Sequence, residues 1–305
     1  MRFAIIGTGA VGGYLAARLA AAGNDVVCVA RGAHRAAIER DGLKILSPLG
    51  DATIRVRARE TLAGEPPVDA ALVTVKLGDT DAGMAAARAA IGAETRVISF
   101  QNGVEGHLLL ARHAAAARVL PGSAYIGAEV AGPGVVRHFG TLARFVFGAL
   151  DGARDPAAEA VLAAFKAAGI DSHIPDGIVR VLWAKFVFLV ALSGVGAAAR
   201  ATTDRIAQTP ELRAAFRAAM AETYALAGAR GIALPADLLD RQVGVLDSMP
   251  AGQKASMLQD LEAGKKLELP WLSGAVARMG AESGVATPVN TTLAAVLVPF
   301  RDGAR

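Results

Sequence analysis

The pattern of apolar and polar positions changes in character along the chain. In the first half, short apolar runs rich in β-branched residues alternate with alanine-rich stretches of helical periodicity. This alternation predicts an α/β fold, in which a parallel sheet is doubly wound with helices on both faces. The expected strands are Phe3–Ile6, Asp25–Val29, Ala70–Val75 and Arg96–Phe100, and the expected helices are Val11–Ala22, Ala36–Asp41 and Ala82–Ile91.

The pattern after residue 120 differs. Three short β-like runs joined by glycine-rich turns predict antiparallel strands added to the sheet: Ser123–Val130, Val135–Phe139 and Leu142–Phe147. From Pro175 onward we find no strong strand pattern. Long helical patterns cover Gly177–Ala199, Pro210–Gly231, Ala236–Leu246, Ser256–Ala263 and Pro270–Gly284. The sequence therefore predicts an α/β domain over residues 1–174 and an all-α domain over residues 175–305.

A glycine-rich motif follows the first expected strand and opens the first expected helix. Gly7, Gly9 and Gly12 form G-x-G-x-x-G, a pattern that is weak alone and much stronger between a strand and a helix. The first glycine permits a tight turn, the second lets a pyrophosphate approach the backbone, and the third lets the helix pack on the strand. We therefore expect a Rossmann-type dinucleotide site. Its cofactor-binding loop is Gly7, Thr8, Gly9, Ala10, Val11 and Gly12.

The residue after the second strand indicates which dinucleotide binds. Sites that select NAD carry an acid there, which binds the ribose hydroxyls. Here the strand runs into Arg31, and the next acids along the chain, Glu39 and Asp41, lie well beyond the strand end. A guanidinium binds a 2′-phosphate well, so the sequence predicts NADPH. The alternative is an ordinary surface arginine.

Composition excludes several classes. Of the 305 residues 53% are hydrophobic and 20% charged, which gives ample material for cores and argues against disorder. The net charge of +4 is scattered, with no basic run longer than Lys265–Lys266, so no nucleic-acid partner is expected. The single cysteine, Cys28, permits no intrachain disulfide and suits a reducing, cytoplasmic setting. The uncharged part of the apolar stretch, Phe186–Ala199, is too short to span a bilayer, so we expect a core helix and no membrane. No metal site is expected.

Lys185 is the only charged residue between Arg180 and Arg200. Burying an ammonium is costly unless it is paired or its pKa falls, and perturbed groups favour functional sites. The alternative is a lysine whose long stem lets the charge reach the surface. The residues alone leave both readings open.

Taken together, these motifs resemble the ketopantoate reductase (2-dehydropantoate 2-reductase) family over nearly the whole chain. The resemblance rests on the glycine motif, Arg31, and further segments spread along both halves. These are Val-Thr-Val-Lys76, Gln-Asn102-Gly, Leu-Trp-Ala-Lys185, Ser256-Met-Leu-Gln-Asp260, Glu268 and Thr287-Pro-Val-Asn290.

The resemblance implies an NADP-dependent oxidoreductase that makes pantoate for pantothenate and coenzyme A. It implies that Lys185 is the general acid that protonates the carbonyl oxygen, and that Glu268 orients substrate or lysine. Ser256 would hold the substrate carboxylate. Asn102 would bridge cofactor, lysine and substrate, and Lys76 would line the cofactor cleft. Such chemistry is reasonable, since hydride addition to a ketone builds negative charge on oxygen that a proton donor offsets.

The chain departs from the family at three positions. Typical members carry asparagine four and eight residues after the lysine and at the start of a later helix, where this chain has Leu189, Ser193 and Ser273. Leu189 and Ser193 share a helical stripe with Lys185 and are expected to line the substrate wall. Two alternatives thus stay open: a relative that reduces a less hydroxylated 2-oxo acid, and a non-catalytic NADP(H) sensor. A homodimer is compatible with the sequence.

Overall fold

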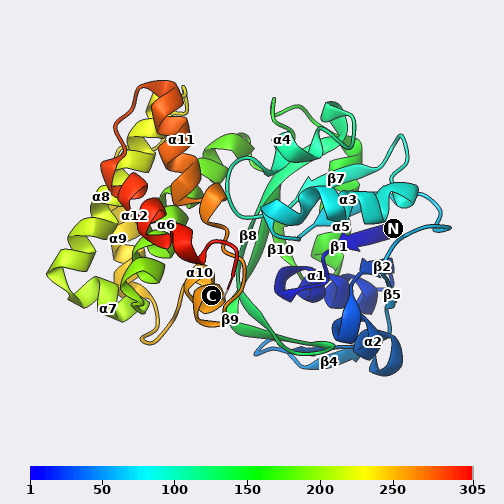
Figure 1. Ribbon diagram of the computed structural model, residues 1–305. Helices are drawn as coiled ribbons and strands as arrows, with labels where there is room; N and C mark the ends of the chain where they lie inside the picture. The colour runs from blue at the N-terminus through cyan, green and yellow to red at the C-terminus, as the bar shows by residue number, and fades with distance from the viewer. Residues whose placement is uncertain (304–305) are drawn as a thin grey trace. The chain divides into compact units, whose positions relative to one another are not determined.

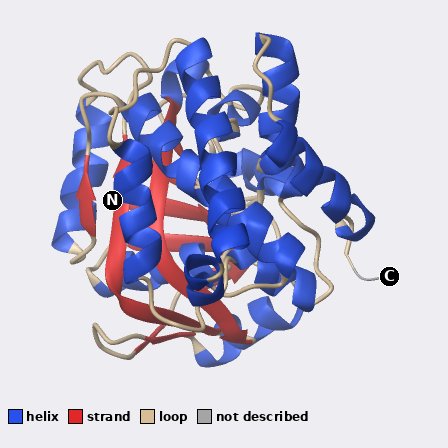
Figure 2. Ribbon diagram, turned by 90° about the vertical axis from the view of Figure 1, so that its left-hand side faces the viewer, coloured by secondary structure: helices blue, strands red, loops and turns tan. Residues whose placement is uncertain are grey.

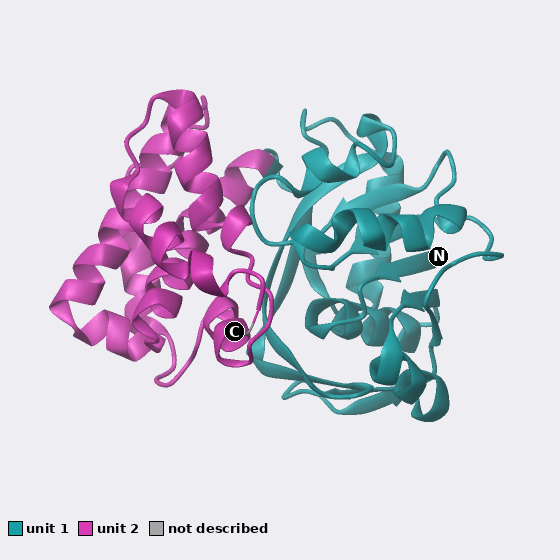
Figure 3. Cartoon of the chain, in the orientation of Figure 1, with its two compact units in different colours: residues 1–178 teal, residues 179–305 magenta. Residues whose placement is uncertain are grey.

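The computed structural model describes residues 1–303, and the chain divides into two compact units (Figure 3). The first unit covers residues 1–178 and contains all the strands of the described residues. The second covers residues 179–305, and its described part is helical. The division thus falls in the first turn of a helix, a few residues after the boundary predicted from the sequence.

The first unit is built on a mixed sheet whose centre is parallel. The parallel strands are β1 (Arg2–Ile6), β2 (Asp25–Val29), β5 (Arg57–Arg59), β6 (Ala70–Val73), β7 (Arg96–Ser99) and the start of β8 (Val119–Gly132). Their order across the sheet is β8-β7-β6-β1-β2-β5. The four strands predicted for the first half are all present, whereas the three-residue β5 was not predicted. The Rossmann-type α/β fold class is confirmed.

Alternate residues of the parallel strands point into two different cores. Along β1, Phe3 and Ile5 belong to one core, and Ala4 and Ile6 belong to the other. The first core also contains side chains of α1 (Ala10–Ala21) and α5 (Pro156–Ala167), and the second contains side chains of α3 (Thr80–Ala87) and α4 (Gly106–Leu110). Figure 1 shows α3 and α1 on opposite sides of β1, and Figure 2 distinguishes the strands of this sheet from the helices by colour. Both faces of the sheet are therefore buried, as predicted.

The antiparallel addition is a long hairpin rather than three short strands. β8 pairs with β9 (Val135–Phe147), which joins the two runs that the sequence separated. The pairing shifts register where Gly140, with φ of 65°, lets the strand pass through an extra loop of residues. Gly140 therefore lies in a bulge within one strand and not in a turn between two strands. β3 (Leu43–Leu46), β4 (Ala52–Ile54) and β10 (Asp171–His173) complete this side of the sheet.

The described part of the second unit consists of helices. They are α6 (Ile178–Ala199), α7 (Thr203–Gln208), α8 (Pro210–Ala229), α9 (Leu238–Ser248), α10 (Ser256–Glu262), α11 (Ser273–Ser283) and α12 (Pro288–Leu297), with 3-10 turns at Leu269–Trp271 and Val298–Phe300. Pro210 occupies the first turn of α8, where its missing N–H is not needed. Pro270 instead lies in a 3-10 turn, so α11 begins three residues later than the predicted helix. α7 and α12 were not predicted.

α6 is the apolar helix of this unit. Its residues Val187, Ala191 and Val195 pack in one core with Phe216 and Met220 of α8. By length and composition α6 could also cross a membrane, with a mean hydropathy of 2.0 in its most apolar window, but 61% of that window is buried in the structure. Such burial fits the core helix that the sequence predicts.

Candidate active site

The glycine-rich loop joins β1 to α1, the context that the motif requires. Gly7 has φ of 98°, and Gly9 is the residue that precedes the first turn of α1. The hydroxyl of Thr8 donates to the carbonyl oxygen of Val29 at 2.9 Å, and the hydroxyl of Thr74 donates to that of Gly7 at 2.6 Å. The loop is therefore fixed to the ends of β2 and β6, and it leads directly into the N-terminus of α1.

The three motif glycines are required for different reasons. A Cβ at Gly7 would lie 2.8 Å from the backbone nitrogen of Val75, and one at Gly12 would lie 2.1 Å from the carbonyl oxygen of Gly7. Packing within the protein thus forbids side chains at both positions. A Cβ at Gly9 would meet nothing within 4 Å, and its extended backbone suits any residue. Protein packing does not explain the glycine at position 9, but close approach of a pyrophosphate does, so the loop fits a dinucleotide.

His34 holds this loop from the side of α2 (Gly32–Asp41). Its Nδ1 accepts a hydrogen bond from the backbone N–H of Gly134 at 3.0 Å. Because that nitrogen can only accept, Nε2 carries the proton and donates to the carbonyl oxygen of Thr8 at 2.7 Å. One ring therefore connects the cofactor loop to the turn between β8 and β9. His34 was not expected from the sequence, since nothing in the local pattern shows that Gly134 lies beside it.

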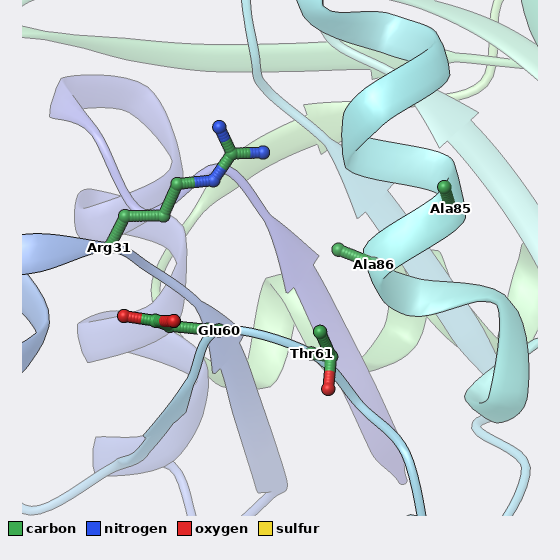
Figure 4. Close-up of a pocket in the computed structure, with 5 residues that line it drawn as sticks. All are labelled: Arg31, Glu60, Thr61, Ala85 and Ala86. Atoms are coloured by element: carbon green, nitrogen blue, oxygen red, sulfur yellow. The ribbon is translucent and has the colours of Figure 1, made fainter.

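Arg31 lines a cavity of about 450 Å³ with Glu60, Thr61, Ala85 and Ala86. Figure 4 shows its guanidinium extending into this space from the end of β2. The side chain has no hydrogen bond or ion pair among the described residues, and it is exposed. A cation so placed can bind an anionic group of a ligand. Glu39, the first acid after Arg31 in the sequence, is paired instead with Arg35 at 2.8 Å and Arg59 at 3.0 Å.

Lys76 and Asn102 follow β6 and β7, which are successive neighbours of β1 in the sheet. Because the three strands are parallel, their carboxyl ends bring the glycine loop, Lys76 and Asn102 to one edge, where ligands bind in such sheets. Both side chains are half-buried. Gln101, which the sequence marked only as part of a motif, supports this edge by donating to the carbonyl oxygen of Val75 at 3.0 Å and to Thr80 Oγ1 at 2.8 Å.

Lys185 lies in the second turn of α6, close in sequence to Trp183 and Phe186, which are both buried. Burial lowers the pKa of its ammonium from 10.5 to about 8, and the negative charge of Glu268 opposes this decrease. Glu268 is half-buried at the start of the 3-10 turn that precedes α11. The structure thus brings these two predicted catalytic residues into electrostatic contact. A lysine with this pKa is a far better proton donor near neutral pH than an ordinary one.

The remaining predicted substrate residues differ in their exposure. Ser256 is exposed in the first turn of α10, and Leu189 is half-buried on α6. Ser193 is fully buried, and its hydroxyl has no hydrogen-bond partner among the described residues. Ser273 on α11 has the same property, and its Oγ would lie 2.7 Å from a Cβ placed at Gly194. The substrate roles of all these residues stay predictions.

A dinucleotide loop and a lysine of lowered pKa, carried by one chain, define a dinucleotide-dependent oxidoreductase that acts on a CH–OH/C=O pair. The family described as Ketopantoate reductase PanE/ApbA matches residues 3–152, and its C-terminal counterpart matches residues 177–299. The chain belongs to the ketopantoate reductase family.

Individual relatives agree with this assignment. The chain is 31% identical to the 2-dehydropantoate 2-reductase of Halobacterium salinarum, over 99% of this chain and 100% of that protein. Its structure is similar to that of a PanE/ApbA family ketopantoate reductase from Ralstonia eutropha, with a TM-score of 0.91, 32% identity, and coverage of 99% and 98% of the two chains. A D-mandelate dehydrogenase in complex with NADH also has a TM-score of 0.91, with coverage of 99% and 98%. At 20% identity that likeness shows the fold alone.

Proposed function

We propose that the protein reduces 2-dehydropantoate (ketopantoate) to pantoate in the cytoplasm, with NADPH as reductant, for pantothenate and coenzyme A synthesis. The observation that carries this proposal is the lowered pKa of Lys185 beside Glu268, in a chain of this family. When bound, the dinucleotide supplies a hydride to the carbonyl carbon. The protein supplies position, charge and a proton.

Lys185 would donate that proton to the carbonyl oxygen. With a pKa of about 8 its ammonium is still largely protonated at pH 7, yet it releases the proton more readily than a lysine at 10.5. Glu268 keeps the pKa from falling further, so the acid is charged when substrate arrives. The exposed hydroxyl of Ser256 would hold the substrate carboxylate, and Asn102 would bind cofactor and substrate at the sheet edge.

Arg31 supports NADPH in preference to NADH. Its guanidinium lines the cavity at the end of β2, where the adenosine ribose of a dinucleotide binds in this class of sheet. A guanidinium binds phosphate through two parallel hydrogen bonds, and no group among residues 1–303 forms a hydrogen bond or ion pair with the Arg31 side chain.

A second substrate class follows from one observation. Leu189 lies one helical turn beyond Lys185, half-buried, and offers no partner for a substrate hydroxyl. Ser193, two turns beyond, is fully buried in the described structure. An apolar wall discriminates weakly between chains with and without a hydroxyl. A less hydroxylated 2-oxo acid such as 2-oxoisovalerate is therefore the alternative substrate.

The experiment compares kcat/KM for ketopantoate and 2-oxoisovalerate with NADPH, on the native protein and on Leu189→Asn. A preference for ketopantoate on the order of a thousandfold, the scale of a dedicated hydroxyl site, supports the proposed substrate. Similar values for both acids, with a shift toward ketopantoate in the variant, support the alternative. Absence of NADPH oxidation with every 2-oxo acid of a panel would instead favour a non-catalytic cofactor sensor.

A further inference from the structure

The cavity that Arg31 lines also contains a carboxylate. Glu60 directly follows β5, which pairs with β2 in a register that sets Arg59 opposite Val29. The ends of these neighbouring strands therefore bring a cation and an acid to one cavity. In Figure 4 the guanidinium of Arg31 and the carboxylate of Glu60 point in different directions, although both residues line the cavity. No ion pair joins them; the ion pair of Glu60 is with Arg35.

That ion pair leaves Glu60 available to a ligand. Arg35 Nε lies 3.5 Å from the Glu60 carboxylate, whereas another nitrogen of the same guanidinium lies 2.8 Å from Glu39. The side chain of Glu60 is 60% exposed, and exposed pairs of this kind contribute little. A ligand hydroxyl that binds the Glu60 carboxylate would therefore break only a weak, exposed ion pair with Arg35.

Dinucleotide sites that take NAD use a carboxylate at the end of β2 to accept hydrogen bonds from the adenosine ribose. Arg31 occupies that position here. We propose that Glu60, one strand away, takes over the role: it accepts from the 2′-hydroxyl of NADH and repels the 2′-phosphate of NADPH. The choice between the two cofactors is then set by the balance of Arg31 and Glu60, and the protein binds both. This inference rests on the proposed function only in that a nicotinamide dinucleotide occupies the cleft.

The test is direct titration of NADPH and of NADH, followed by nicotinamide fluorescence, without any 2-oxo acid. In Glu60→Gln we expect the Kd for NADH to rise roughly tenfold, because a charge-assisted hydrogen bond becomes a neutral one. The Kd for NADPH should fall, because a like charge beside the phosphate is removed. The ratio of the Kd for NADH to the Kd for NADPH therefore increases by more than about tenfold.

Glu39→Gln is the matched control. It makes the same change in charge and disturbs the same Arg35, but Glu39 does not line the cavity. We expect it to leave the ratio within about twofold of the native value, since long-range effects of an exposed charge are screened. An unchanged ratio in Glu60→Gln, or an equal shift in Glu39→Gln, overturns the role of Glu60.

The outcomes separate this inference from the proposed reaction. If the native protein binds both nucleotides and Glu60→Gln shifts their ratio, the inference stands even when ketopantoate is not reduced. If the native protein binds neither nucleotide, the inference and the proposed function both fail. If it reduces ketopantoate with NADPH and has no measurable affinity for NADH, the reaction stands and the role of Glu60 is refuted.

Discussion

The glycine loop of the α/β unit and helix α6, which carries Lys185, differ in how their polar groups are hydrogen-bonded and buried. Around the loop, Thr8, Thr74 and His34 all donate to backbone carbonyl oxygens. On α6, the hydroxyl of Ser193 is buried without a partner among the described residues, and burial lowers the pKa of Lys185 to about 8. The polar groups around the loop thus form their hydrogen bonds before a ligand binds. On α6, by contrast, the buried hydroxyl of Ser193 and the buried ammonium of Lys185 cost free energy that no described hydrogen bond of Ser193 offsets. Perturbation of this kind is typical of the place where chemistry occurs.

The largest expected effect concerns α6. In Lys185→Ala we expect kcat with NADPH and ketopantoate to fall about 10² to 10⁴-fold, the usual contribution of a general acid. The Kd for NADPH should stay near its native value, because the loop is unchanged. Lys185→Arg should not restore turnover, because a guanidinium does not release its proton near neutral pH. Stopped-flow turnover and fluorescence titration measure the two effects, and a normal kcat in the alanine variant would show that Lys185 is only structural.

The second prediction separates two glycines within the loop. Gly9→Ala should fold with native stability and bind NADPH roughly tenfold to a hundredfold more weakly, because its methyl group occupies the space of the pyrophosphate. Gly12→Ala should lose about 1–3 kcal/mol of stability or more, because its Cβ would overlap the carbonyl oxygen of Gly7. Thermal unfolding and NADPH titration of both variants test this. Equal loss of stability in the two would contradict the distinction.

The third prediction concerns Arg31. Arg31→Ala should weaken NADPH about tenfold to a hundredfold and leave NADH nearly unchanged, because only NADPH presents a phosphate to the guanidinium. Titration with both nucleotides provides the comparison. Equal weakening of both would mean that Arg31 supports the cavity and does not recognise the phosphate.

The smallest expected effect is at His34. His34→Leu should raise KM for NADPH severalfold and leave kcat almost unchanged, because the loop loses one of its connections without losing the lysine. His34→Gln, whose amide can both accept and donate, should recover part of the native KM. A loss confined to kcat would contradict a role in positioning the loop.

The sequence predicted what local patterns encode. The first strand, the glycine loop and the first helix were expected where they occur, because the motif requires glycine at Gly7 for the tight turn and at Gly12 for close packing. Lys185 was noticed because it is the only charged residue between Arg180 and Arg200, in a long apolar stretch. His34 was missed because it contacts Gly134, which lies 100 positions away in the sequence. The position of Glu60 was missed because β5, which precedes it, is only three residues long. The burial of Ser193 likewise could not be predicted, because helical spacing shows which residues share a face but not what packs against that face.

The proposed reaction depends most on Lys185 acting as a proton donor whose pKa Glu268 raises, and the pH dependence of kcat/KM tests this directly. The ammonium must be protonated to act, so activity with ketopantoate should fall as pH rises through about 8. In Glu268→Gln the carboxylate that raises the pKa of Lys185 is removed, so the falling limb should move to lower pH. A native profile that stays flat to pH 10, or a limb that fails to move down in the variant, would contradict the account.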